Sequence, residues 1–426
     1  MKVLVIGGGG REHAIVWSLA RSRRVDKIFC CPGNAGIAEH AECVNIPPTD
    51  FGALLNLVRY EWIDLTIVGP EEPLARGIAD AFRKQGRNIF GPGADAARLE
   101  ASKSFSKDFM RRYGIPTAEY KVFNSYVHAE DYVRLKGGPI VIKADGLAAG
   151  KGVVVAKTPE EASVALRQIM KDKAFGEAGE KVVVEECLEG EEASFMAFTD
   201  GKAIIPLASS QDHKRVFDND KGPNTGGMGA YSPAPVLTPE IEALAMEKVM
   251  KPFLYGIKTE QMDYRGVIYA GLMIKDGDIK VLEFNVRLGD PETQAVLPRL
   301  DTDFFEIALA VSENRLSEMS VNWKPGASVA IVAASAGYPG KYEKGKPVSG
   351  LQEIKKMDDV VVFHSGTAFE DNITVTSGGR VLAVTALGED IEKARDQAYK
   401  AISGIKFEGM HYRKDIAAKA LPHRHF

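Results

Sequence analysis

The sequence PIVIKADGLAAGKGVVV, residues 139–155, has two apolar, β-branched runs separated by a glycine-rich segment that carries Lys143 and Lys151. β-Branched residues favour strands and glycines favour turns, so this stretch predicts a β-hairpin with a cationic tip. Glycines let backbone N–H groups approach an anion, and lysines supply positive charge. We therefore expect a phosphate-binding loop, with a plain glycine-rich hairpin as the alternative. A P-loop is excluded because Gly152 and valines follow Lys151, where that motif requires Ser or Thr and a helix.

Length and composition predict a multidomain globular protein. The 426 residues are too many for one core and favour roughly two to four domains, and 45% hydrophobic with 26% charged residues is an ordinary globular balance. A net charge of −4 gives no general attraction to nucleic acid or to anionic membranes. No apolar run reaches the roughly 18–20 residues of a membrane span. We therefore expect no nucleic-acid partner and no membrane partner.

Two features predict a cytoplasmic location. Residues 1–6 run straight into glycines, as a first strand does and a signal peptide does not. The four cysteines lack metal-ligand spacing, so reduced thiols are the expectation. Cys187 stands among acidic residues, which raise the pKa of a thiol, and this argues against a cysteine nucleophile.

The first hundred residues alternate between strand and helix patterns, which predicts a doubly wound parallel sheet. The expected strands are 2–6, 27–31, 64–69 and one from 89, and the expected helices are 11–22, 51–60 and 74–85. Open α/β sheets bind ligands where their strands end, which here means the loops 7–10, 32–36 and 69–71. The first of these loops precedes a helix N-terminus and suits a phosphate, or is a tight turn. The dinucleotide fingerprint is excluded, because its third glycine would fall on Glu12.

The remaining chain predicts two further units. The central unit is expected to contain helices 103–113, 159–171 and 239–255, strands 181–186, 266–274 and 280–286, and a long polar loop over 212–231. The C-terminal unit is expected to be a small α+β domain with strands 329–334, 360–363 and 381–386 and a helix 391–405. The predicted boundaries are 1–101, 102–325 with a flexible subdomain at about 120–190, 326–421, and a tail at 422–426.

The strand at 280–286 carries polar side chains on one face. Side chains alternate along a strand, so Glu283, Asn285 and Arg287 point one way. A carboxylate and an amide oxygen suit a Mg²⁺ ion that also binds phosphate oxygens, and Arg287 suits an anion held in a fork. The alternative is a half-solvated strand face.

Two weaker segments add further polar groups. The apolar strand at 182–184 runs into a linker with Glu185, Glu186 and Glu192, which suits a nucleoside base and its ribose, or is an acidic surface turn. Residues 212–215 and 224–229 combine basic side chains with a glycine turn. They suit a second, smaller anion, or form a solvated basic loop.

Taken in order, these segments resemble the ATP-grasp superfamily and, within it, the phosphoribosylamine–glycine ligase family of purine biosynthesis. The resemblance runs from residue 1 to about residue 421 and rests on GGGGREHA (7–14), PGNAG (32–36), VGPE (68–71), KADGLAAGKG (143–152), NTGGMGAY (224–231) and LEFNVRLGDPETQ (282–294). It implies a multidomain α/β and α+β protein: an N-terminal doubly wound parallel sheet, a central ATP-grasp fold and a small C-terminal α+β cap. In that fold the nucleotide lies between two antiparallel layers, one of them in the flexible subdomain.

The resemblance also implies roles for individual residues. Those implied to bind ATP are Lys103, Lys143, Gly150, Lys151, Gly152, Glu185, Glu186, Leu188 and Glu192, and those implied to bind Mg²⁺ or Mn²⁺ are Glu283 and Asn285. Those implied to bind the second substrate are Gly8, Gly10, Asn34, Glu71, Asp212, Lys214, Asn224, Gly226 and Arg287, with catalytic contributions from Lys143, Arg287 and Asp212. Many relatives carry another acidic metal ligand on the preceding strand. Residues 267–274 contain no Asp or Glu, so Asp290 or Glu292 is the alternative ligand.

The implied reaction is the ATP-dependent ligation of glycine to 5-phosphoribosylamine through glycyl phosphate. Phosphoryl transfer depends on positioning and charge neutralisation more than on a covalent nucleophile, and none is evident here. A glycine-rich flap would shield the acyl phosphate from water. The expected partners are small molecules only, with the chain a monomer or a weak homo-oligomer.

Three alternatives stay open. One is another ATP-grasp carboxylate–amine ligase or a purine-pathway carboxylase. A second is an NAD-dependent oxidoreductase, which only the N-terminal sheet suggests. The third is a nucleotide sensor without catalysis, which would not need the lysine loop and the Glu283–Asn285 pair together.

Overall fold

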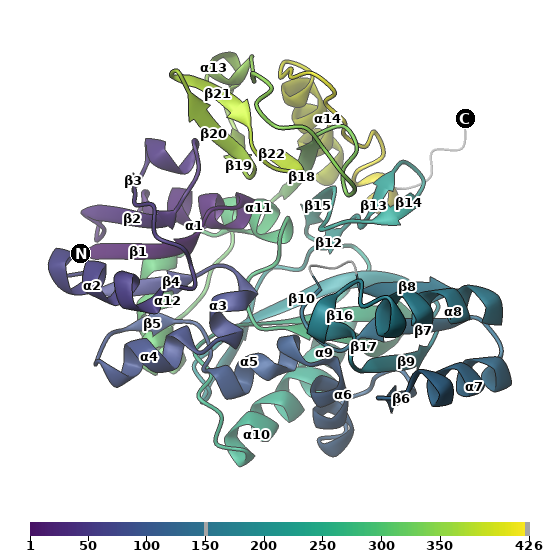
Figure 1. The fold of residues 1–426 in the computed structure, drawn as a ribbon. Helices are drawn as coiled ribbons and strands as arrows, with labels where there is room; N and C mark the ends of the chain where they lie inside the picture. Colours follow the sequence, from purple (N-terminus) through teal and green to yellow (C-terminus); the bar gives the residue numbers. More distant parts are fainter. Residues whose placement is uncertain (149–151, 422–426) are drawn as a thin grey trace.

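The computed structural model describes residues 1–148 and 152–421 (Figure 1). Within these ranges the strands form two five-stranded sheets, two four-stranded sheets and two hairpins. This confirms the expected multidomain α/β and α+β class with an N-terminal parallel sheet. The predictions for Gly150, Lys151 and the tail at 422–426 lie outside the described residues.

The N-terminal sheet has the order β3-β2-β1-β4-β5, and all its pairs are parallel. Val3 and Val5 belong to one hydrophobic cluster and Leu4 and Ile6 to another, so both faces of β1 are buried, as a doubly wound sheet requires. The strands are β1 Lys2–Gly7, β2 Lys27–Pro32, β3 Glu42–Cys43, β4 Leu65–Val68 and β5 Ile89–Phe90, with helices α1 Gly10–Leu19, α2 Phe51–Glu61, α3 Glu71–Ala75, α4 Ile78–Lys84 and α5 Ala94–Ala101.

The predicted single helix at 74–85 is wrong. Two helices occupy this region, α3 and α4, because Gly77 between them has φ of 84°. This left-handed conformation interrupts a right-handed helix, and glycine adopts it without a steric penalty.

The second sheet, β6-β9-β7-β8, contains the hairpin predicted over residues 139–155. β7 (Ile140–Ala144) pairs antiparallel with β8 (Val153–Ala156), as the sequence predicts. β6 is Tyr120–Phe123 and β9 is Val182–Glu186, and α7 (Tyr126–Lys136) and α8 (Pro159–Leu166) pack against this sheet. Ile140, Ile142 and Ala144 share a hydrophobic cluster with these helices. Lys143 is therefore left on the opposite face.

The third sheet, β11-β10-β16-β17, lies beside the second in the central region (Figure 1). Its strands are β11 Ile204–Pro206, β10 Glu191–Thr199, β16 Gly266–Lys275 and β17 Asp278–Asn285, all antiparallel. β10 was not predicted from sequence, because it begins inside an acidic segment that suggests a turn. An isolated bridge between Thr117 and Val281 connects β17 to the chain that leads into the second sheet.

The fourth sheet, β12-β15-β18-β22-β19, corrects the prediction of a long loop over 212–231. That segment contains the strands β12 Gln211–Asp212, β13 Arg215–Phe217, β14 Lys221–Asn224 and β15 Gly229–Ser232. β15 pairs with β18 (Ala327–Ala334), a partner distant in sequence, so no local periodicity announces it. The sheet is completed by β22 (Arg380–Gly388) and β19 (Val360–His364), with α14 (Ile391–Ile402) packed on β18 and β22. Its strands thus come from both sides of the expected boundary at 325.

The remaining helices join the sheets into shared cores. Phe253 packs its ring against Phe109 and Phe284, with centroid distances of 6.2 and 5.7 Å. This contact fixes a helix and a strand relative to each other, and such aromatic pairs contribute about 0.5–1.5 kcal/mol beyond their buried area. The helices are α6 Lys103–Arg112, α9 Pro239–Ala245, α10 Lys251–Thr259, α11 Glu292–Val296, α12 Phe304–Ser312 and α13 Leu351–Ile354, and the second hairpin is β20 Thr367–Glu370 with β21 Ile373–Thr376.

Within residues 1–148 and 152–421, no helix combines the length and the apolar composition that crossing a membrane requires.

Candidate active site

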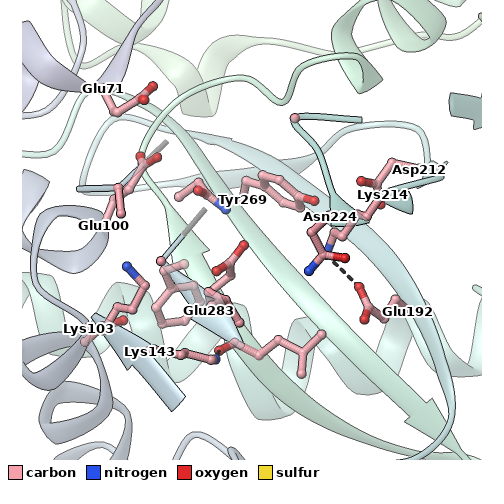
Figure 2. A pocket seen from close by; sticks show the side chains of 18 of the residues that line it. Glu71, Glu100, Lys103, Lys143, Glu192, Asp212, Lys214, Asn224, Tyr269 and Glu283 are labelled. Atoms are coloured by element: carbon pink, nitrogen blue, oxygen red, sulfur yellow. Dashed lines mark hydrogen bonds and ion pairs between the residues drawn. The ribbon is translucent and has the colours of Figure 1, made fainter. Parts of the chain in front are cut away.

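A pocket of about 500 Å³ is lined by residues from the N-terminal helices α1, α3 and α5, both central sheets and the C-terminal strand β22. Figure 2 shows lysines and carboxylates from these elements converging on it. The predicted site residues that line it are Glu71, Lys103, Lys143, Gly152, Glu185, Glu186, Leu188, Glu192, Asp212, Lys214, Asn224, Gly226, Glu283, Asn285 and Arg287. Gly150 and Lys151 lie outside the described residues, so their roles stay predictions.

Gly8, Gly10 and Asn34 are described but do not line this pocket. The Asn34 side chain donates to the backbone oxygens of Gly8 and His364, both at 2.8 Å, and its own oxygen accepts the N–H of Ile37. It therefore ties the N-terminal sheet to β19. The substrate-binding roles of these three residues stay predictions.

A buried ion triad forms the side of the pocket that belongs to the second sheet. Glu185 Oε2 lies 2.9 Å from Lys107 Nζ and 3.0 Å from Lys143 Nζ. All three side chains are almost fully buried, and burial lowers the pKa of Lys107 to about 8, against the attraction of Glu185. Two ammonium groups share one carboxylate, so the charged triad carries a net positive charge. This charge suits a polyphosphate.

The base of the hairpin is fixed to the N-terminus of α6. Asp145 accepts the N–H of Ser104 at 2.6 Å, and Lys103 Nζ donates to the backbone oxygen of Gly146 at 3.1 Å. Burial lowers the pKa of Lys103, although the Glu283 carboxylate opposes the shift. Lys103 is the first residue of α6, and its ammonium group adds to the positive side of the pocket.

Glu283 and Asn285 project from β17 toward the pocket. Burial opposes ionisation of Glu283, but the neighbouring ammonium groups outweigh it and lower the pKa of this carboxyl; they belong to Lys214, Lys143 and Lys103. Among the described residues, no donor forms a hydrogen bond with the Glu283 carboxylate. Asn285 Oδ1 accepts one bond, from Arg287 Nη2 at 3.1 Å. An ionised carboxylate beside an amide oxygen fits a hard divalent cation whose other ligands are phosphate oxygens and water.

Arg287 is held by two carboxylates from the N-terminal region. Its guanidinium lies 2.8 Å from Glu100 and 3.4 Å from Glu71. Burial alone would lower the pKa of Arg287, but these carboxylates raise it above its usual value. The cation is therefore fixed in orientation where α3, α5 and β17 meet.

The opposite end of the pocket contains Glu192, Asp212 and Lys214 (Figure 2). Lys214 Nζ lies 2.6 Å from Glu192 Oε2, and this ammonium lowers the pKa of the Glu192 carboxyl. Burial raises the pKa of Asp212 to about 7, with Glu292 and Glu192 adding to the shift and Lys214 opposing it. A carboxyl that titrates near neutral pH suits proton transfer.

Sequence reasoning missed several residues of the pocket. Lys107 follows Lys103 by one helical turn, so two inward-facing lysines at this spacing were a usable signal. No sequence pattern points to Arg380, which lies at the start of β22. Its guanidinium lies 2.8 Å from Asp290 and also donates to the backbone oxygen of Gly226. Only the tertiary structure brings the C-terminal region to the pocket.

Comparison with protein-family models finds three matches along the chain. The N domain of phosphoribosylglycinamide synthetase matches residues 1–100, the ATP-grasp (A) domain matches 101–293 and the C domain matches 328–419.

Curated relatives match over almost the whole chain. A phosphoribosylamine–glycine ligase from Escherichia coli O6:H1 is 52% identical over 425 residues, covering 99% of each chain. One from Vibrio parahaemolyticus is 50% identical over 424 residues with the same coverage.

Solved structures agree with these matches. The crystal structure of a phosphoribosylamine–glycine ligase from Thermotoga maritima matches with a TM-score of 0.84 at 35% identity, covering 98% of this chain and 100% of that one. The biotin carboxylase domain of Hydrogenobacter thermophilus 2-oxoglutarate carboxylase, solved with MgADP, ADP and bicarbonate, matches with a TM-score of 0.72 at 17% identity, covering 96% and 91%. The second match shows a shared fold only.

Proposed function

This chain belongs to the phosphoribosylamine–glycine ligase family of ATP-grasp enzymes, and we propose that its pocket performs the family reaction through a glycyl phosphate intermediate. The enzyme is an ATP-dependent ligase of purine biosynthesis that joins glycine to 5-phosphoribosylamine. One observation carries the proposed mechanism: the cationic triad formed by β7, β9 and α6 and the ionised Glu283 of the third sheet line one pocket.

The first step joins glycine to the terminal phosphate of ATP. A carboxylate oxygen of glycine attacks the γ-phosphorus, the bond to the β–γ bridging oxygen breaks, and ADP leaves. Lys103 and Lys143 neutralise the polyphosphate, and charge neutralisation with in-line positioning is the main requirement of phosphoryl transfer. The adenine base of ATP is held by the backbone of residues 185–188, because the Glu185 side chain is already paired with Lys107 and Lys143.

A divalent cation, Mg²⁺ or Mn²⁺, fits the oxygen atoms of Glu283 and Asn285. Such an ion, when bound, adds charge stabilisation at the phosphate oxygens. Glu283 stays ionised for this role because lysines lower the pKa of its carboxyl, and Arg287 orients the Asn285 amide through a hydrogen bond.

The second step transfers the glycyl group to nitrogen. The neutral amine of 5-phosphoribosylamine attacks the acyl carbon, phosphate leaves, and the new amide nitrogen loses a proton. Asp212 is the proposed acceptor of that proton, since its pKa is raised to about 7. Lys214, Asn224, Gly226 and Arg287 supply the polar contacts for the sugar phosphate.

Three further properties belong to the proposal. They are a cytoplasmic location, a monomer or weak homo-oligomer that acts on small molecules alone, and domain boundaries at 101/102 and 325/326. The net charge of −4 supports the absence of nucleic-acid and membrane partners.

The test is ADP release by the full-length chain with Mg²⁺. We expect release only when ATP, glycine and 5-phosphoribosylamine are all present, with one glycinamide ribonucleotide formed per ADP. Replacing glycine by bicarbonate tests the carboxylase alternative that the biotin carboxylase fold suggests. Turnover with bicarbonate and none with glycine would reject the proposal.

A further inference from the structure

Most of the carboxylates that line the pocket are paired with a cationic side chain. Pairing matters because a buried carboxylate without a compensating charge is strongly disfavoured. The pairs are Glu185 with Lys107 and Lys143, Glu186 with Lys280, Glu192 with Lys214, Glu71 and Glu100 with Arg287, and Asp290 with Arg380.

Glu292 is an exception to this pairing. It is 2% exposed and lines the pocket from the start of α11, yet within the described residues it forms no ion pair. Its Oε1 atom accepts hydrogen bonds from Tyr269 Oη at 2.8 Å and Ser194 Oγ at 2.9 Å. Arg287 and Arg380 are near enough to interact with it electrostatically, but both guanidinium groups are engaged with other carboxylates.

The second oxygen of Glu292 is kept uncovered by a glycine. A side chain at position 289 would place its Cβ atom 2.5 Å from Glu292 Oε2, so only glycine leaves this atom free. The two hydroxyl groups hold Oε1 and thereby fix the orientation of the carboxylate. One anionic oxygen is fixed by the protein, and the other is left for a ligand.

We propose that Glu292 binds the ammonium group of the amino-acid substrate. This inference rests on the proposed function, in which glycine is the only organic substrate that carries a cation in its reactive state. ATP is anionic, and 5-phosphoribosylamine reacts as a neutral amine with an anionic phosphate. Repulsion from Glu292 also turns the glycine carboxylate away, toward the lysines, where it is phosphorylated.

Glu292 and Asp212 then serve two different nitrogen atoms. Glu292 holds the ammonium that stays charged throughout, and Asp212 serves the amine that attacks. Glu292 thus becomes a specificity residue, because it selects a carboxylic acid with a cation next to the carboxylate.

The test compares glycine with glycolate, which replaces the ammonium by a hydroxyl, in wild type and in Glu292→Gln. Glutamine keeps an oxygen for Tyr269 and Ser194 and replaces the second oxygen by an uncharged NH2 group. We expect the KM for glycine to rise about 10–100-fold, as for a lost charge-assisted hydrogen bond. The kcat/KM for glycolate, read as ADP release, and the KM for ATP should each change by less than about threefold.

The same measurements separate the two ways of failing. Absence of glycine-dependent ADP release in wild type rejects the proposed function itself. Normal wild-type turnover, with a Glu292→Gln variant that is equally active or loses glycine and glycolate to the same extent, overturns this inference alone. If that variant does not fold, Glu292→Asp decides, since it keeps the charge on a shorter side chain. A loss of activity with glycine but not with glycolate supports the inference. An equal loss with both acids, or no loss, rejects it.

Discussion

The two central sheets contribute opposite charge patterns to one pocket. Beside the second sheet, Glu185 is paired with both Lys107 and Lys143. Two ammonium groups therefore share one carboxylate, and one positive charge is left over. On the side of the third sheet, Glu283 and Glu292 form no ion pair within the described ranges. The difference shows that each side is complete only with a ligand of the opposite sign: a polyphosphate for the lysines, and a metal ion and an ammonium for the carboxylates. The substrates therefore complete charge pairs that the fold leaves open.

The largest expected effect comes from the carboxylate side. Glu283→Ala should lower kcat about a thousandfold or more, because metal-assisted charge stabilisation is worth several kcal/mol. The measurement is ADP release at saturating substrates, with circular dichroism to confirm an intact fold. Asp278→Ala is the matched control, since Asp278 lies on the same strand in an exposed ion pair with Lys248. Wild-type turnover by Glu283→Ala would remove the metal assignment.

The next effect concerns the side of the pocket where Glu185 pairs with two lysines. Glu185→Ala leaves two buried ammonium groups without their shared carboxylate, and removing one partner of a buried pair costs about 3–5 kcal/mol. Urea unfolding should show this loss in the free energy of unfolding. Glu189→Ala is the control, because its pair with Lys275 is exposed to solvent, where ion pairs contribute little to stability. Equal losses in both variants would contradict the internal charge balance assigned to the second sheet.

The smallest effect is a pH dependence at Asp212. Its pKa is raised to about 7 in the folded protein, against about 4 in an unfolded chain. Between these values the folded state binds more protons, so its stability falls as the pH rises through this window. From about pH 5 to about pH 8, wild type should lose about 1–2 kcal/mol relative to Asp212→Asn, because solvent in the pocket screens part of the charge. A difference that stays constant with pH would show that Asp212 is ionised throughout.

Local pattern was enough for much of the architecture. The β-branched runs on either side of the glycines predict the β7–β8 hairpin, and alternation on β17 predicts that Glu283 and Asn285 share a face; both lie along the pocket as expected. Prediction failed where pairing is distant in sequence. β15 pairs with β18 about a hundred residues later, so its own residues look like a loop.

The candidate site divides in the same way. The types of its residues were visible in the sequence, because lysines near glycines and carboxylates on strands have recognisable chemistry. Their partners were not: Lys107 for Glu185, Glu100 for Arg287 and Arg380 for Asp290 come from other elements.

The order of the units, the lysine hairpin, the Glu283–Asn285 pair and the family to which the chain belongs follow from the amino-acid sequence alone. These depend on neighbours along the chain, where periodicity and turn chemistry act. Which charges are already paired, and which are left for substrates, depends on how the chain packs in space. Electrostatic interaction depends on the distance between charges and on their burial. Residues far apart in sequence can therefore form an ion pair: Lys107 and Lys143 lie 2.9 and 3.0 Å from the Glu185 carboxylate.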